Sequence, residues 1–415
     1  MTINYLSVFI KIAFIIVICF VIIKAICVIY KRGYKIPEDN TINTNSSYVR
    51  IYYDPTTIPS LYQAYDFLNQ SKEAISFVCW QRIPNLEKNL SSYKNVHVFN
   101  HYENSVWNAV DISPIKEFVL NNPDAKFIIH SSENWLNRIL YIFDIIPKDA
   151  IKEVHLYEDS SYAMHVNINQ THKNEIANIR NTVLKDVKVF YHAREVSELN
   201  SLQCIYDKKC YMLKKSHRND ILTEASPERL KENLNKNESI KEAYFKIFNF
   251  NYKKFKEELK HPFGIFTFGR YWKDYFANLQ IAFLNEITGG KLNYLVQKEN
   301  VNWYYKEHPK MYDEPMFEEI LNTERPDLKS IDRNIPMEMF ILADIVPDCV
   351  AGYYSSMYFN IPAENISAYI KHPDDPYIKI FKRKHTIKPG RILELSDIYN
   401  DRKLFWSKML VKIFR

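Results

Sequence analysis

Short apolar runs alternate with amphipathic segments along most of the chain after residue 47. The runs are four to six residues long, as expected for strands, and the longer segments between them space their apolar residues as helices do. We expect strands at 48–53, 75–80, 96–99, 126–130 and 153–157. Strands that alternate with helices predict a mainly parallel sheet with helices on both faces.

The pattern changes over residues 171–260, which we interpret as mostly helical, with a helix start at Ser226-Pro227-Glu228. A second alternation follows, with strands at 263–268, 303–305 and 349–354. The fold class expected is therefore α/β, with two doubly wound halves facing each other across a cleft. Ligands of such folds bind beyond the carboxyl ends of the strands.

The first 35 residues predict a membrane anchor. Residues 6–30 are nearly all apolar, with Lys11 and Lys24 as the charged interruptions, and the stretch is long enough to span a bilayer. Basic residues follow this run and none precedes it, which favours an uncleaved anchor with the rest of the chain in the cytoplasm. The alternative is an anchor of the opposite orientation. Residues 36–47 are a polar linker.

The other end of the chain, residues 396–415, predicts a basic amphipathic helix. In its last fourteen residues, Leu404, Phe405, Met409, Ile413 and Phe414 are set against a basic remainder. Such a helix could lie on an anionic membrane surface or pack against the core. Between the two ends we expect a first domain at 48–258 and a second domain at 259–395.

Composition narrows the chemistry. The chain has 415 residues, 47% hydrophobic and 25% charged, with a net charge of +6 and no long basic run, so it is globular and nucleic acid is a weak candidate partner. Its six cysteines form neither a disulfide framework nor a metal-ligand set. No glycine lies between Gly33 and Gly264, which excludes a phosphate-binding glycine loop from the first half. The sequence has no Asp-x-Asp pair, so the usual metal-bridged nucleotide-sugar site has no obvious ligands.

Three groups of reactive side chains follow predicted strands. They are Glu158-Asp159, His308 with its neighbour Lys306, and the pair Ser355-Ser356. Each has an ordinary structural explanation: a solvated acidic turn, one of three His-Pro pairs, and a helix cap. Together they would supply a base, an acid and an anion site, which is what group transfer from a phosphate ester requires.

The motifs also resemble those of a known family. LYEDSS, KEHP and YYSSMYF are similar to the acidic pair, the Lys-Gly-His-Pro and the Ser-Ser-Leu-Tyr-Phe of the bacterial sialyltransferases of glycosyltransferase family 80. The opening IYYDPTTIPSLYQAYDFL resembles the first strand, turn and helix of that family. IPMEMF and FTFGRYW supply two further matches, and the resemblance covers residues 48–400. Ser160 and Glu307 stand where the family has glycine.

This resemblance implies a GT-B fold and inverting, metal-independent transfer of sialic acid from CMP-sialic acid to a galactose-type acceptor. Asp159 would be the general base and His308 the acid partner of the leaving phosphate, with Glu158 and Ser161 in support. The donor would be bound by Ser355, Ser356, Glu338, Lys306, Pro309 and Trp272, with Arg82 and Asn104 as less closely aligned contacts.

We expect an enzyme at the cytoplasmic face of a bacterial inner membrane that acts on a glycolipid or glycan such as lipooligosaccharide or capsule. It needs no cofactor, because CMP-sialic acid is its donor substrate. Two alternatives stay open. One is a related transferase that uses another CMP-ulosonic acid or a polysialic acid acceptor, and the other is an inactive relic that binds a glycan or a nucleotide.

Overall fold

A computed structural model describes most of the chain after residue 47. The described residues are 48–70, 73–102, 109–132, 140–158, 179, 182–193, 221–269, 274–308, 316–353, 355–371, 387–388, 390–394 and 406–410. The predicted anchor and linker, residues 1–47, lie outside them. Within these ranges, no helix is long and apolar enough to cross a membrane.

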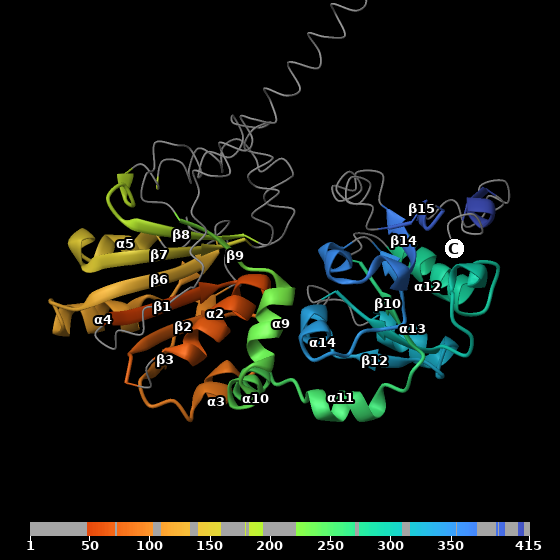
Figure 1. Ribbon diagram of the computed structural model, residues 1–415, viewed down its shortest axis with the longest axis horizontal. Coiled ribbons are helices and arrows are strands. Elements are labelled where there is room, and N and C mark those ends of the chain that lie inside the picture. The colour runs from red at the N-terminus through yellow and green to blue at the C-terminus, as the bar shows by residue number, and fades with distance from the viewer. Residues whose placement is uncertain are drawn as a thin grey trace, which may run out of the picture.

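The first half of the chain builds a seven-stranded sheet in the order β3-β2-β1-β6-β7-β8-β9, and every pair in it is parallel (Figure 1). Its strands are β1 (Tyr48–Asp54), β2 (Ser76–Trp80), β3 (Val96–Val98), β6 (Lys126–Ser132), β7 (Ile151–Tyr157), β8 (Lys188–Ala193) and β9 (Ile221–Glu224). A small antiparallel pair, β4 (His101–Tyr102) and β5 (Ala109–Val110), lies outside this sheet.

The second half builds a six-stranded parallel sheet in the order β12-β11-β10-β13-β14-β15. Its strands are β10 (Phe263–Thr267), β11 (Asn302–Lys306), β12 (Lys329–Ile331), β13 (Cys349–Tyr353), β14 (Ile366–Lys371) and β15 (Ile392–Glu394). Two parallel sheets therefore divide the chain, as the pattern predicts. The exact domain limits at 258 and 395 stay predictions.

Helices cover both faces of the sheets (Figure 1). In the first half they are α2 (Ile58–Asn69), α3 (Leu86–Leu90), α4 (Ser113–Asn121) and α5 (Leu140–Ile145), followed by α9 (Pro227–Asn235), α10 (Glu238–Ile247) and α11 (Tyr252–Glu258). In the second half they are α12 (Asp274–Thr288), α13 (Met316–Glu324) and α14 (Met337–Leu342). Short 3₁₀ helices are η2 (Lys148–Ala150) in the first half and η4 (Asn293–Leu295), η5 (Ser356–Asn360) and η6 (Ala363–Asn365) in the second.

The turn after β1 shows how local sequence fixes an element. Asp54 is fully buried, and its carboxylate accepts hydrogen bonds from the backbone of Thr56 at 2.8 Å and of Ser60 at 2.7 Å. Ser60 lies in the first turn of α2, where Pro59 needs no donor partner. The carboxylate therefore caps a helix start whose own cap residue, Thr57, makes no side-chain hydrogen bond.

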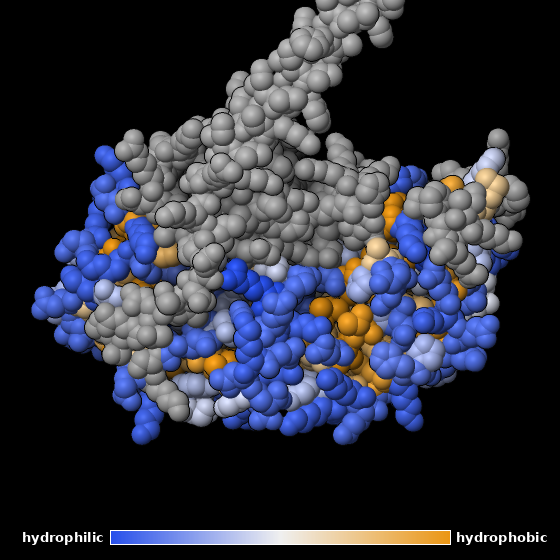
Figure 2. Space-filling model, in the orientation of Figure 1, coloured by the Kyte–Doolittle hydropathy of each residue, from blue (hydrophilic) through white to orange (hydrophobic). Residues whose placement is uncertain are grey.

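Three apolar clusters form the core. One lies on the face of the first sheet covered by α4 and α5, and one packs β10 and β11 against α12. The remaining cluster is continuous across both halves, because it joins Trp80 and Tyr244 to Phe340 and Tyr369. α9 contacts α14, and Lys231 of α9 forms an ion pair with Asp344, which lies just after α14. The visible surface is mainly hydrophilic, with its largest apolar area over the second half (Figure 2).

The sequence pattern missed several strands. Residues 171–260 contain β8 and β9, which extend the first sheet by two parallel strands, while α9, α10 and α11 make the described stretch 221–260 mainly helical as expected. The second half also contains β12, β14 and β15, which the pattern did not predict. β12, β15 and β9 are three or four residues long, too short for a periodic signal. The helix start at Ser226-Pro227-Glu228 is confirmed, and the Ser226 side chain accepts a hydrogen bond from the backbone of Arg229.

Candidate active site

The donor side of the predicted site lies at the carboxyl edge of the second sheet. Thr267, the last residue of β10, pairs with Lys306 on β11 and with Gly352 on β13. Three strand ends are therefore adjacent, and each leads into one of the predicted motifs. Gly352 has a φ of 139°, and a Cβ atom there would meet the Thr267 carbonyl oxygen at 2.2 Å. Only glycine allows the two strands this close approach.

Lys306 ends β11 as a buried cation. Its ammonium group donates to the carbonyl oxygens of Arg333 at 3.0 Å and Glu307 at 3.4 Å. Burial lowers the pKa of Lys306 to about 8, while the carboxylates of Glu338, Asp332 and Glu307 act in the opposite direction. The residue is thus held in place by backbone oxygens and lies in the field of three acidic side chains.

Glu307 and His308 leave β11 without strain. Glu307 replaces a family glycine, yet its φ is not positive, so the side chain is accommodated by an ordinary backbone. Its carboxylate lies 3.8 Å from the guanidinium of Arg333. His308 follows directly and is half-buried, at the edge where the donor is expected. The structure does not describe Pro309.

Ser355 follows β13 and caps η5. Its hydroxyl accepts a hydrogen bond from the backbone of Met357 at 3.4 Å, and its φ of −160° is extended. The capping interpretation of this serine is therefore confirmed. A cap and an anion site are compatible, because a helix start presents further backbone N–H groups. The side chain of Ser356 lies outside the described residues.

Glu338 lies in the first turn of α14 and is buried, with 6% of its surface exposed. One carboxylate oxygen accepts a hydrogen bond from the Asn360 side chain at 2.8 Å. The sequence motifs gave no role to Asn360. The only signal for it was a polar residue at the end of the apolar stretch SMYFN.

On the side of the predicted site where the acceptor is expected, the structure describes β7 and the residue after it. β7 finishes at Tyr157, and the next residue, Glu158, is buried with its backbone N–H donating to the His192 carbonyl at 3.0 Å. Asp159, Ser160 and Ser161 lie outside the described residues, as do Asn104 and Trp272. Arg82 is half-buried in the turn after β2. Trp80, two residues earlier, is a core residue that donates to Gln63.

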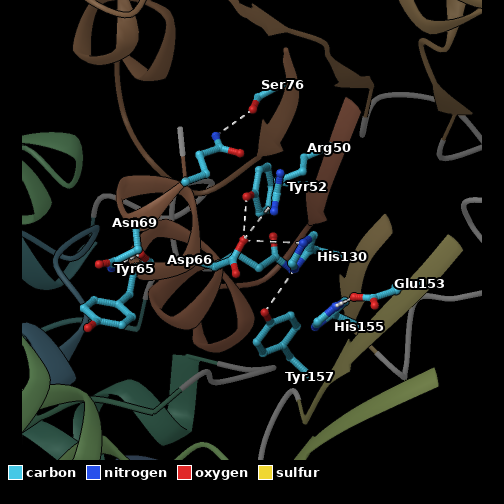
Figure 3. A network of polar contacts seen from close by, with 12 residues as sticks. Arg50, Tyr52, Tyr65, Asp66, Asn69, Ser76, His130, Glu153, His155 and Tyr157 are labelled. Carbon is cyan, nitrogen blue, oxygen red and sulfur yellow. Dashed lines mark hydrogen bonds and ion pairs between the residues drawn. The ribbon is translucent and has the colours of Figure 1, made fainter. Parts of the chain in front are cut away.

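A buried polar network crosses the middle of the first sheet, and sequence reasoning missed it (Figure 3). Asp66 of α2 accepts from the Tyr52 hydroxyl at 2.6 Å and lies 3.9 Å from Arg50. The His130 ring stacks on Tyr52 at 4.5 Å and contacts the Tyr157 hydroxyl at 3.1 Å. Desolvation by burial lowers the pKa of His130 well below 6.5 and raises that of Tyr52 well above 10.

The network continues on β7 and β8. His155 contacts His192 at 2.9 Å and Glu153 at 3.3 Å, and its ring stacks on that of His130. Burial lowers the pKa of His192 well below 6.5 as well. No three His, Cys, Asp or Glu side chains of the described ranges are grouped as a metal site. These histidines act within the sheet, where they pack and hydrogen-bond with one another.

Comparisons with known proteins agree with the predicted resemblance. A family model described as Sialyltransferase PMO188 matches residues 233–382, which include Lys306, His308, Glu338 and Ser355. No protein with curated annotation matches the sequence.

Three solved structures share the fold. A Photobacterium sp. JT-ISH-224 2,6-sialyltransferase, crystallised with CMP and lactose, has 18% identity and a TM-score of 0.65 over 84% of this chain and 78% of its own. A sialyltransferase from Photobacterium damsela has 18% identity and a TM-score of 0.63 over 83% of this chain and 81% of its own. An α/β-galactoside α-2,3-sialyltransferase from Photobacterium phosphoreum has 18% identity and a TM-score of 0.60 over 85% of this chain and 99% of its own. The GT-B fold is therefore confirmed, and the matches support a glycosyltransferase.

Proposed function

We propose that this protein is an inverting sialyltransferase that moves sialic acid from CMP-sialic acid to a terminal galactose-type hydroxyl. One observation carries the proposal: in a fold shared with sialyltransferases, three adjacent strand ends and α14 gather Lys306, His308, Ser355 and Glu338 at one edge. An imidazole, a hydroxyl cap, a buried carboxylate and a buried ammonium are suited to a nucleoside monophosphate leaving group.

The proposed reaction is a single displacement. Asp159 takes the proton of the acceptor hydroxyl as its oxygen attacks the anomeric carbon of sialic acid from the face opposite CMP. The bond from that carbon to the phosphate oxygen breaks, and the electron pair leaves with CMP. Protonated His308 and the start of η5, with Ser355 and Ser356, stabilise the phosphate, while Glu338 binds the ribose hydroxyls. One displacement inverts the anomeric centre, and no step in it uses a metal or a cofactor.

Around this chemistry, we propose that Lys306 and Pro309 flank the cytosine and that Trp272, Asn104 and Arg82 contact the donor sugar. We further propose that Glu158 and Ser161 support the turn that carries Asp159. Glu158 is suited to this role, because its backbone is tied to β8 through the His192 carbonyl.

We also propose a cytoplasmic enzyme anchored to a bacterial inner membrane by residues 6–30, with a lipooligosaccharide or capsule glycan as acceptor. The short helical segment 406–410 supports membrane contact at the other end of the chain. Its Ser407 is buried and donates to the Gly390 carbonyl, whereas Trp406 and Met409 are exposed at 49% and 37%. The segment therefore packs through a polar residue and leaves apolar ones on the surface.

The test is product analysis. The full-length protein, incubated with CMP-sialic acid and lactose, is expected to release CMP and form a sialylated lactose whose anomeric centre is inverted, as NMR would show. The same product identifies the linkage, which differs between the 2,6- and 2,3-sialyltransferases that share this fold. Turnover only with other CMP-ulosonic acids, or only on polysialic acid, would identify the related transferase. Thermal stabilisation by CMP without turnover on any acceptor would identify a binding relic.

A further inference from the structure

Asn360 and Glu338 form a buried pair at the donor edge. Asn360 is the last residue of η5, the 3₁₀ helix that Ser355 caps, and 8% of its surface is exposed. Its amide nitrogen donates to the Glu338 carboxylate at 2.8 Å. A hydrogen bond to a charged acceptor, shielded from water, is among the stronger contacts of a protein.

The pair also fixes the orientation of the amide. The Asn360 amide oxygen is buried and has no hydrogen-bond partner among the described residues. If the amide were reversed, this oxygen would face the carboxylate of Glu338 and the two acceptors would repel each other. The carboxylate therefore determines how the amide points, and the amide in turn restricts how the carboxylate can rotate.

Stability alone does not explain an asparagine at this position. A buried amide with an idle oxygen beside a buried carboxylate is unfavourable, and an apolar pair of similar volume in place of both side chains would avoid that cost. What the amide does supply is a directed contact to Glu338. The contact matters most if the second face of the carboxylate has to meet a ligand in a defined geometry.

One short helix, η5, runs between the residues proposed to bind two different parts of the donor. η5 begins at the serine pair proposed for the phosphate and ends at Asn360, which contacts the carboxylate proposed for the ribose. α14, which carries Glu338, packs directly against η5. The two ends of this five-residue helix therefore lie at residues with different proposed roles in binding the donor.

We propose that Asn360 is a positioning residue for the donor nucleotide, holding the Glu338 carboxylate in the orientation that accepts the ribose hydroxyls. This inference rests on the proposed function, which assigns the ribose to Glu338. Its specific consequence is that the loss of Asn360 weakens recognition of the ribose hydroxyls and leaves the rest of the nucleotide contacts intact.

The test compares CMP with 2′,3′-dideoxy-CMP, which lacks both ribose hydroxyls, by isothermal titration calorimetry. The wild-type protein is expected to prefer CMP by about 10- to 100-fold, the range for hydrogen bonds to a charged group. In Asn360→Ala the preference should fall to about threefold or less, with affinity for the dideoxy nucleotide unchanged. A merely structural role would lower both affinities alike, and an unchanged preference would show no role; either result overturns the inference.

A double-mutant cycle with Glu338→Gln adds a second readout. If Asn360 acts through Glu338, then Asn360→Ala should cause no further loss of preference in the Glu338→Gln background, whereas additive losses would contradict the proposal. Asn360→Ser replaces Asn360→Ala throughout if the alanine variant does not fold. The matched control is Asn365→Ala, which removes an amide that donates to the Pro347 carbonyl at the same distance of 2.8 Å in the neighbouring η6. It should leave the CMP preference unchanged.

The same experiments separate this inference from the proposed function. A wild-type protein that turns over CMP-sialic acid, prefers CMP and is indifferent to Asn360→Ala would overturn only the role of Asn360. A wild-type protein that does not bind CMP would overturn the proposed function and this inference together.

Discussion

The ionisable side chains lie at different positions in the two sheets. This difference distinguishes residues that stabilise the fold from residues placed to bind a ligand. In the first sheet, Arg50, His130 and His192 lie within the strands; Arg50 and His130 contact Asp66 in the interior, and His192 contacts His155. In the second sheet, Lys306 lies on the last residue of its strand, and Glu338 lies in the first turn of a helix. Side chains at strand ends and helix starts face the cleft in which α/β proteins bind ligands. Those in the middle of a strand contribute to the stability of the sheet.

This comparison predicts that polar substitutions in the first sheet change stability, whereas those at the donor edge change binding and turnover. The largest effect is expected for Asp66→Ala, which takes away the carboxylate that contacts buried Arg50 and Tyr52. We expect the free energy of unfolding to fall by about 3–5 kcal/mol, as for other broken buried charge pairs. Urea unfolding measures it.

Asp149→Ala is the matched control for that prediction. Asp149 pairs with Lys126 at 4.0 Å, but its side chain is 85% exposed. Its removal should change stability by less than about 0.5 kcal/mol, as surface substitutions generally do. Equal losses in the two variants would contradict the assignment of a stabilising role to the buried network.

At the donor edge, His308→Ala should reduce transfer to lactose by about 10²- to 10³-fold, the usual contribution of a positioned acid, while the midpoint of urea unfolding stays the same. His261→Ala is the control, because His261 also precedes a proline but contacts Asp348 at 2.6 Å on the surface of the second half. Comparable loss of activity in both variants would show that a His-Pro pair matters for folding and not for chemistry.

A smaller effect on the free energy of unfolding is expected from a change in pH. Burial lowers the pKa values of His130 and His192 well below 6.5, so both are neutral in the folded protein at pH 7, whereas the unfolded chain takes up protons below about pH 6.5. The free energy of unfolding is therefore highest above that pH. It decreases as the pH falls, by up to about 1.4 kcal/mol per pH unit for each histidine. Urea unfolding at pH 7 and pH 5.5 measures the slope. His130→Phe should reduce it, and an equal slope in the variant would argue against a neutral, buried His130.

Sequence patterns predicted the parts of the fold that repeat. β1, β2, β6, β7, β10 and β13 are long apolar runs, and each was expected near its observed position. β8, β9, β12, β14 and β15 were not predicted; β9, β12 and β15 have only three or four residues, a length at which periodicity is a weak signal. The alternation of strands and helices was enough to predict the two α/β halves.

The candidate site was predictable where motifs end a strand. Lys306 and His308 lie at the end of β11 and Ser355 follows β13, the two strands that flank β10, and the sequence predicted only that each motif comes at the end of a strand. Asn360 and the His130 network were not predictable, since contacts such as Glu338–Asn360 and Asp66–His130 join residues far apart in the sequence and depend on how helices pack on the sheet. The role of Asp159 stays a prediction from the resemblance.

The most direct test of the account is a pair of measurements on Asp159→Ala. If the first half supplies the base and the second half holds the donor, this variant should bind CMP with an affinity within about threefold of the wild type, yet release CMP from CMP-sialic acid and lactose about 10²- to 10⁴-fold more slowly. Near-normal turnover, or loss of CMP binding in the folded variant, would contradict the division of roles between the two sheets.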